Sequence, residues 1–431
     1  MRKLLWATAR VLVIAAVLAM LGLSALLFTA RAIVRPTPGD WATTLRVGPL
    51  KMDVGVAALV QWGSTPWIAR QLHGHTLPTR LGQVRLAWDE ASQQLQLHCQ
   101  PCTLRSSSWG GEPIRLQDAR MTVRRNATEL RGTLQSGAVT ATWHGTLRPT
   151  GITLHIAVPS TPVANGYALF ASAIPEVATA QIDGTFALKA TLELPSKQLR
   201  VQPRLDGMAV SGLGTEAWAQ AQSQCSRGLP AVMVRAHVRN DSLLAHAVLA
   251  AEDQRFYEHP GYDLVEMSKA LRSNQAEDAT LRGASTLSQQ VAKLLVTGGV
   301  RSPVRKLREL LYAVEMEQTL GKARILQLYL SHAPWGATVC GAQAAAHTYF
   351  GKRADQLTAA QAVWLAAMLH NPALEAQRWK ARGNINLERA QWVAAGLRPL
   401  RRAERTQLLA DLAVMGPTER TASHLAALSK Q

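Results

Sequence analysis

The sequence predicts an α+β multi-domain protein: an N-terminal transmembrane helix, an antiparallel β-rich region and an all-α domain. Three observations predict this order. An uncharged apolar run lies near the N-terminus, hydrophobicity alternates with a period of two over residues 82–210, and helical spacing follows from about residue 241. The expected parts are a cytoplasmic tip and anchor (1–35), the β-rich extracytoplasmic region (36–240), the helical domain (241–373) and a helical C-terminal extension (374–431).

The composition is that of a globular protein with an unusually positive charge. The chain has 431 residues, 47% of them hydrophobic, and a net charge of +18. This composition excludes a disordered, collagen-like or multi-span membrane protein. A strongly basic chain implies an anionic partner. Residues 36–241 hold 19 Lys and Arg against 13 Asp and Glu, spread without a basic block, which argues against nucleic acid as that partner.

The apolar run from Val11 to Ala30 has 20 residues and no charge. As a helix it spans about 30 Å, the thickness of a bilayer's hydrocarbon core. Arg2, Lys3 and Arg10 precede it, so the positive-inside rule keeps the N-terminus in the cytoplasm. We expect a single-pass protein of the cytoplasmic (inner) membrane with the rest of the chain on the periplasmic side. The alternative is a signal peptide cleaved near Ala30, which also exports the chain.

The four cysteines fit an exported chain. Cys99 and Cys102 form a Cys-Gln-Pro-Cys segment, for which a redox or zinc role is one interpretation. A second CxxC and a His pair at finger spacing are both missing from the sequence, which favours a small structural disulfide. Cys225 and Cys340 are far apart in the sequence, and their pairing is left open.

The β-rich region is predicted from short alternating segments separated by Gly, Asn, Pro and Ser. Alternation within 83–88, 94–99, 121–124, 139–143, 152–156 and 186–192 indicates antiparallel hairpins with one buried face. We expect one helix over 55–72, before these strands, and another over 163–173, among them. No residue pattern in this region indicates catalysis.

The helical domain is predicted from its capping signals. Thr286 and Thr358 are each followed three residues later by Gln, which is the spacing of a capping box. Ser302 precedes Pro303, a typical helix start. Residues 282–308 carry six Lys and Arg and no acid, and small residues precede the helix that begins near 286, which suits a bound phosphate. Glu252 lies at a predicted helix end beside aromatic residues, where a raised pKa would suit a general base; the alternative from these residues alone is a solvated helix face.

Five motifs occur in order: EDxxFxxHxGxD from 252, a Gly-small-Ser-Thr-x-x-Gln-Gln-x-x-Lys run from 283, RKxxE from 305, KARILQLYL from 322 and YFGK from 349. Together they closely resemble glycosyltransferase family 51, the peptidoglycan glycosyltransferases of class A penicillin-binding proteins and of monofunctional transglycosylases. The resemblance covers about residues 240–373. It implies a lysozyme-like helical domain that polymerises lipid II into glycan strands and releases undecaprenyl pyrophosphate.

The resemblance also assigns roles by position. Glu252 matches the general base that deprotonates the acceptor 4-hydroxyl, with inversion at the donor's anomeric carbon. Glu309 matches the second catalytic carboxylate, which handles the donor pyrophosphate directly or through a divalent cation such as Mg²⁺ or Mn²⁺. The implied partners are lipid II, the growing glycan strand, the membrane and other cell-wall synthesis proteins. The implied substrate-binding positions are Asp253, Phe256, His259, Ser285, Thr286, Gln289, Gln290, Lys293, Arg305 and Lys306.

The chain departs from the family pattern at two positions, with Ala284 in place of a second Gly and Ser331 in place of Asn. These departures motivate an alternative, a non-catalytic envelope scaffold that binds lipid-linked precursor or glycan. A glycan-cleaving lytic enzyme is a third hypothesis, which gives no reason for six cations beside the site. With 59 residues after Pro372, we expect no transpeptidase domain and no penicillin binding.

Overall fold

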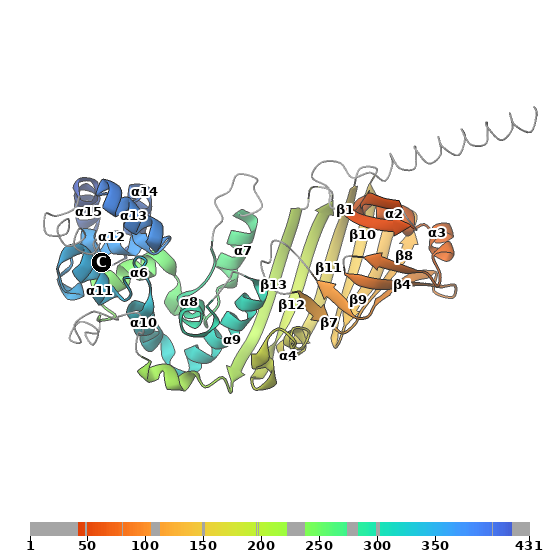
Figure 1. Ribbon diagram of the computed structural model, residues 1–431, viewed down its shortest axis with the longest axis horizontal. Coiled ribbons are helices and arrows are strands. Elements are labelled where there is room, and N and C mark those ends of the chain that lie inside the picture. Colours follow the sequence, from red (N-terminus) through yellow and green to blue (C-terminus); the bar gives the residue numbers. More distant parts are fainter. Residues whose placement is uncertain are drawn as a thin grey trace, which may run out of the picture. The chain divides into compact units, whose positions relative to one another are not determined.

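The computed structural model describes residues 42–415, apart from 48–49, 80, 105–112, 149–150, 195, 197, 222–237, 274–282, 299–301 and 399. The described chain divides into two compact units, each visible in Figure 1. The β unit holds the described residues up to Ala173 together with Thr185–Asp206. The helical unit holds Ile174–Gly184 and the described residues from Gly207 onward.

A nine-stranded antiparallel sheet dominates the β unit, with strand order β13-β12-β11-β10-β9-β8-β5-β4-β3. Two further two-stranded sheets pair β1 with β2 and β6 with β7. This confirms the predicted antiparallel hairpins. The strands are β1 Ala42–Val47, β2 Leu50–Gly55, β3 Thr76–Thr79, β4 Gly82–Asp89, β5 Gln94–Cys99, β6 Cys102–Leu104, β7 Ile114–Leu116, β8 Ala119–Asn126, β9 Glu129–Ser136, β10 Val139–Arg148, β11 Gly151–Pro162, β12 Gln181–Leu194 and β13 Gln198–Ser211.

Alternation along the strands separates an apolar from a polar face of the large sheet. In β10, Trp143 and Leu147 are buried while His144 is exposed, because successive side chains of a strand point to opposite faces. Trp143 and Leu147 pack with Leu130 of β9, and Val60 of helix α2 (Val56–Gly63) packs against this cluster. The alternating pattern is therefore explained by burial of one face of the sheet.

The helix predicted over 55–72 is instead two helices, α2 and α3 (Pro66–Gln71). Thr65 between them is extended, with ψ of 126°, because the ring of Pro66 disfavours a helical conformation for the preceding residue. Arg125 of β8 fixes this corner by donating to the carbonyl of Gln61 (2.6 Å) and to the hydroxyl of Thr65 (3.0 Å). The helix predicted over 163–173 is the shorter α4 (Val163–Ala168).

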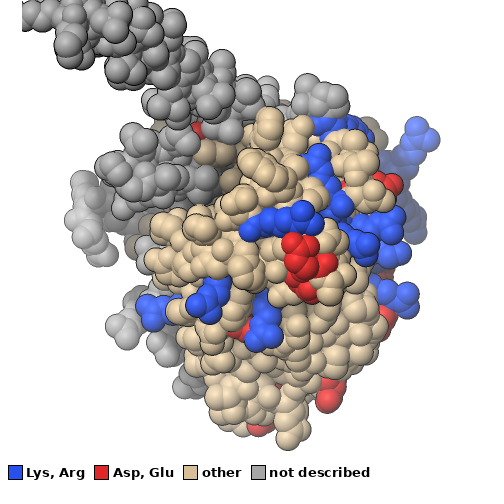
Figure 2. Space-filling model, turned by 90° about the vertical axis from the view of Figure 1, so that its right-hand side faces the viewer, with Lys and Arg blue, Asp and Glu red and all other residues tan. Residues whose placement is uncertain are grey.

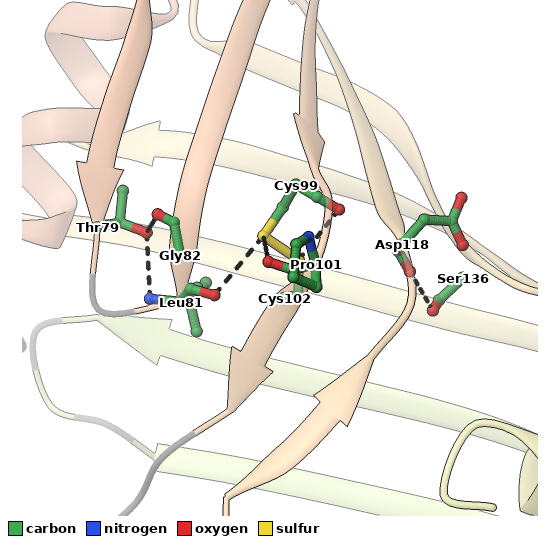
Figure 3. The surroundings of a disulfide bond; sticks show 8 residues. All are labelled: Thr79, Leu81, Gly82, Cys99, Pro101, Cys102, Asp118 and Ser136. Atoms are coloured by element: carbon green, nitrogen blue, oxygen red, sulfur yellow. Dashed lines mark hydrogen bonds between the residues drawn. A yellow bond between two sulfur atoms is a disulfide. The ribbon is translucent and has the colours of Figure 1, made fainter. Parts of the chain in front are cut away.

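The predicted disulfide between Cys99 and Cys102 is confirmed. It joins the end of β5 to the start of β6 around Pro101, as Figure 3 shows. Cys340 is also disulfide-bonded. Cys225, whose pairing with Cys340 was left open above, lies outside the described residues. On the face drawn in Figure 2, Lys and Arg gather toward the upper right and a few lie at the lower left, with a patch of Asp and Glu between them.

The helical unit is an all-α bundle around one apolar core. Buried tryptophans at 335, 364 and 379 lie in this core. Residues of the predicted C-terminal extension, including Trp379, Val393 and Leu408, belong to the same core. The helices are α6 Leu243–Glu252, α7 Leu264–Ser273, α8 Leu287–Ala292, α9 Pro303–Thr319, α10 Gly321–His332, α11 Ala342–Phe350, α12 Ala359–Met368, α13 Pro372–Arg382, α14 Leu387–Gly396 and α15 Arg402–Val414; single turns η2 Pro175–Ala178, η3 Thr215–Gln220, η4 Phe256–Glu258 and η6 Ala354–Gln356 and the π-helix η5 Lys293–Thr297 complete it.

The predicted fold class needs one correction, which concerns the transmembrane helix. Within the ranges given above, no helix combines the length and the apolar character needed to cross a bilayer. The longest of them, α9, has 17 residues and carries both acidic and basic side chains. Residues 1–35, on which the membrane helix was predicted, lie outside the described part of the chain. The described fold is thus α+β without a membrane-spanning helix.

Candidate active site

Glu252 is the last residue of α6, a helix whose buried residues are all apolar. Its side chain is 14% exposed. Gln290 of α8 donates from Nε2 to Oε2 of Glu252 (3.0 Å), and the hydroxyl of Tyr329 donates in turn to Oε1 of Gln290 (3.3 Å). Burial raises the pKa of the Glu252 carboxyl above 4.5, against the lowering effects of Gln290 and of Arg389. A carboxylate in this state is suited to accept a proton.

Arg389 is a residue of this site that sequence reasoning missed. It lies on α14, within the predicted C-terminal extension, and its Nη2 is 3.9 Å from Oε1 of Glu252. The same Nη2 donates to the carbonyl of Ala251 (2.8 Å), and the guanidinium lies over the ring of Trp392 at 4.2 Å. No motif quoted above includes Arg389, so only the fold reveals its position beside the carboxylate.

Asp253, the residue after Glu252, forms a buried hydrogen-bond network with His259. Nε2 of His259 is 3.0 Å from both carboxylate oxygens of Asp253, and the backbone N–H of Gly261 donates to Nδ1 of His259 (3.2 Å). Because Nδ1 accepts, the proton is assigned to Nε2, which donates to Asp253. Asp253 also accepts from the backbone N–H of Leu287, the first residue of α8 (2.9 Å). This network therefore joins the ends of α6 and α8.

These contacts place three predicted substrate-binding residues inside the domain. Asp253, Phe256 and His259 are each at most 9% exposed. Lys322 of α10 also contacts this network. Its Nζ donates to the carbonyl of His259 (2.6 Å) and lies 4.4 Å from the centroid of the Phe256 ring. The same ammonium forms an ion pair with Glu317 (2.9 Å). In the structure Asp253, Phe256 and His259 therefore contact other residues of the domain.

The capping box predicted at the start of α8 is present. The hydroxyl of Thr286 accepts from the backbone N–H of Gln289 (3.2 Å), and Oε1 of Gln289 accepts from the N–H of Thr286 (3.3 Å). The Thr286 hydroxyl also donates to the carbonyl of Gly261 (2.7 Å). Gly261 has φ of +90°, and a Cβ there would meet the carbonyl oxygen of Ala313 at 2.9 Å, so this turn requires glycine.

The second predicted carboxylate, Glu309, lies on α9 and is 1% exposed. Nζ of Lys306 is 2.6 Å from its Oε2, and Nε of Arg305 is 3.4 Å from its Oε1. Neither carboxylate oxygen accepts a hydrogen bond of standard geometry from the described residues. Lys306 also donates to the hydroxyl of Ser285 (2.5 Å). Burial lowers the pKa of the Lys306 ammonium, against the raising effect of Glu309.

The segment from Ser285 to Gln290 contacts both carboxylate sites, because Ser285 contacts Lys306 and Gln290 contacts Glu252. Lys293 is exposed, and its charge also acts to lower the pKa of Lys306. The structure therefore brings together most of the predicted positions. Arg282 and Arg301 of the predicted basic run lie outside the described residues. Ser331, one of the two departures, donates to the carbonyl of Gln327 within α10 (2.6 Å).

The resemblance left open whether Glu309 acts directly or through a divalent cation, and the described residues around Glu309 do not fit a cation site on their own. Mg²⁺ prefers several oxygen ligands in octahedral geometry. The described residues give Glu309 two cationic neighbours, and they contain no group of three or more His, Cys, Asp or Glu placed to hold a metal ion. We therefore derive no step through a metal.

This site defines a class of protein: a helical domain that holds both a nearly buried carboxylate, Glu252, and a cluster of cations around a second carboxylate, Glu309. Residues 234–397 match the family model described as "Transglycosylase". The chain is 46% identical over 156 residues to a biosynthetic peptidoglycan transglycosylase of Chromohalobacter salexigens, covering 36% of this chain and 64% of the relative.

Two other relatives carry the same name. The protein of Pseudomonas aeruginosa is 44% identical over 149 residues, which cover 34% of this chain and 62% of the relative. That of Aeromonas hydrophila is 50% identical over 126 residues, which cover 29% of this chain and 53% of the relative. The chain thus spans somewhat over half the length of these curated relatives, and the nine-stranded sheet lies outside the residues matched by the family model.

Proposed function

We propose that this protein is a peptidoglycan glycosyltransferase that polymerises lipid II and releases undecaprenyl pyrophosphate. The observation that carries the proposal is the nearly buried Glu252, whose raised pKa suits a base, in one helical unit with the cationic cluster of Arg305 and Lys306. The relatives' shared name, biosynthetic peptidoglycan transglycosylase, supports the same reaction class. We place the activity in the cell envelope, at the outer face of the cytoplasmic membrane, where a lipid-linked substrate lies.

In the proposed reaction Glu252 accepts the proton of the acceptor sugar's 4-hydroxyl. The hydroxyl oxygen then forms a bond to the donor's anomeric carbon from the face opposite the leaving group, which inverts the configuration. The bond from that carbon to the pyrophosphate oxygen breaks, and its electron pair leaves with the pyrophosphate. Arg305 and Lys306 stabilise the charge that develops there, because preplaced cations are most effective where charge appears in the transition state. Glu309 holds these two cations in place.

The test is polymerisation of lipid II by the purified protein. We expect the wild type to form glycan strands and Glu252→Gln to lose activity roughly 10²–10⁴-fold, the usual contribution of a general base. Glu258→Gln is the matched control, because Glu258 lies in the same segment but is 51% exposed. Lipid II binding without chain growth by the wild type would instead select the scaffold hypothesis. Equal activity of wild type and Glu252→Gln would overturn the assigned base.

A further inference from the structure

Helix α9 has a second face, next to the one that carries the cationic cluster. Arg308, Tyr312, Glu315 and Thr319 follow one another at spacings of four, three and four residues, so they lie along one side of the helix over about 17 Å. Their partners are residues 174–178 and 213–218, which precede the stretch matched by the family model, 234–397. All these segments belong to the helical unit.

The first contact is a buried ion pair between Glu176 and Arg308. Nε of Arg308 is 2.8 and 3.0 Å from the two carboxylate oxygens of Glu176, and Nη2 is 2.6 Å from Oε1. Glu176 is only 6% exposed. Burial alone would raise the pKa of Glu176, but the hydrogen bonds and charge of Arg308, together with hydrogen bonds from the backbone and from Tyr312, hold that pKa below its ordinary value. This geometry is the bidentate form in which Arg binds a carboxylate most strongly.

The second contact is made by Glu315, which is 2% exposed. Its carboxylate accepts from the backbone N–H groups of Leu213 (2.7 Å) and Thr215 (3.3 Å). The hydroxyl of Thr215 hydrogen-bonds that of Thr319 (2.8 Å) one helical turn further on. The ring of Trp218 stacks on that of Tyr312, with centroids 5.4 Å apart.

The two partner segments are the two ends of one β-hairpin. Residues 175–178 form the turn η2 just before β12, and residues 213–218 follow directly after β13. β12 and β13 are neighbours in the sheet. We call the contacts of Glu176, Leu213 and Thr215 with Arg308 and Glu315 the hairpin brace. These contacts hold α9 against residues that precede the stretch matched by the family model, 234–397.

We propose that the hairpin brace sets the position of α9 and thereby the affinity of the active site for pyrophosphate, with Glu176, Arg308 and Glu315 as positioning residues. This inference rests on the proposed function, because it takes the cluster on α9 as the donor's pyrophosphate site. Arg308 directly precedes Glu309 in the sequence and follows Arg305 and Lys306 within one turn. A shift of α9 at Arg308 therefore moves the cations that contact the leaving group.

The experiment compares full-length variants in two assays: lipid II polymerisation, and binding of inorganic pyrophosphate by calorimetry. We expect Glu176→Gln and Arg308→Lys each to raise the KM for lipid II and the Kd for pyrophosphate about tenfold, with a smaller change in kcat. The charge exchange Glu176→Arg with Arg308→Glu should recover most of the affinity. Arg204→Gln is the control, because Arg204 lies on β13 in an exposed pair with Asp206. Thermal unfolding identifies any variant that fails to fold.

The two assays separate the brace from the proposed function. If the wild type binds pyrophosphate, the brace variants bind it more weakly and no variant polymerises lipid II, the proposed function fails and the brace stands. If folded Glu176→Gln and Arg308→Lys keep the wild-type KM and pyrophosphate affinity while the wild type polymerises lipid II, the brace is overturned. A wild type that binds no pyrophosphate would also overturn it.

Discussion

At the scale of single residues, the environment of Glu252 explains why the pKa of its carboxyl group is raised, which suits the proposed role of base. Its burial opposes ionisation, while Gln290 and Arg389 favour it. A general base works best when its pKa is brought towards the operating pH without being pushed past it. The pKa of Glu252 is therefore set by two opposing effects. Of the two groups that lower this pKa, Gln290 and Arg389, only Arg389 carries a positive charge.

This balance predicts a pH effect for Arg389→Gln. Loss of the Arg389 charge raises the pKa of Glu252 further, and the base must be ionised to act. The acidic limb of kcat/KM against pH should therefore move to higher pH, whereas Arg389→Lys should keep it near the wild-type position. Arg405→Gln is the control, because it also removes an arginine that contacts α14, the helix of Arg389. Arg405 donates to the carbonyls of Ala394 (3.0 Å) and Leu397 (3.1 Å) at the C-terminal end of α14. An unmoved limb in Arg389→Gln would contradict the tuning role.

Sequence reasoning found the chemical groups of the site but not their orientation. The motif around Glu252 named Asp253 and His259 as well, and spacing alone could not show that these two side chains bind each other inside the protein. Their pairing depends on the turn at Gly261 and on the start of α8, which come together only in the fold. Arg389 was missed for the same reason, since 137 positions separate it from Glu252.

At the scale of elements, helix starts were the most predictable feature. Both capping boxes, at Thr286 and at Thr358, are present as predicted. A capping box is a contact between residues three positions apart, so the local sequence contains all of its information. The single helix expected over 55–72 failed because apolar spacing was followed across Pro66, which imposes an extended residue before it.

The two capping boxes make a matched pair for mutation. We expect Thr286→Ala and Thr358→Ala each to lower the free energy of unfolding by about 1 kcal/mol, the usual contribution of an N-cap. Only Thr286→Ala should also reduce lipid II polymerisation, because α8 carries Gln290, which contacts Glu252. Chemical denaturation and the polymerisation assay measure the two effects. Full activity in Thr286→Ala at the same loss of stability would contradict this role of α8.

At the scale of the whole molecule, the sequence predicted the β-rich region, but it did not predict how far along the chain the helical core extends. The helical pattern indicated helices beyond residue 373, but periodicity does not show which helices share a core. The structure places Trp379, Val393 and Leu408 in the core that also contains Trp335 and Trp364. The C-terminal helices are therefore part of the unit that forms the candidate active site.

This shared core predicts that the C-terminal helices are needed for stability. Trp379 is 2% exposed, and Trp379→Ala should lower the free energy of unfolding by about 3–5 kcal/mol, as expected when a large aromatic side chain is removed from a core. Trp67→Ala should change it by less than about 0.5 kcal/mol, because Trp67 is 69% exposed. Denaturation followed by circular dichroism at 222 nm measures both. Similar values for the two variants would contradict the shared core.

The hairpin brace has a consequence for how far this protein can be divided. The family match suggests a separable module of residues 234–397, yet two charged residues of α9, Arg308 and Glu315, depend on groups that lie before it. Cut at that boundary, the chain would leave Arg308 without Glu176 and Glu315 without the N–H groups of Leu213 and Thr215. Buried charges that lose their partners destabilise a fold strongly. The stretch matched by the family model and the smallest fragment that keeps these contacts are therefore different, and that fragment has to include the hairpin.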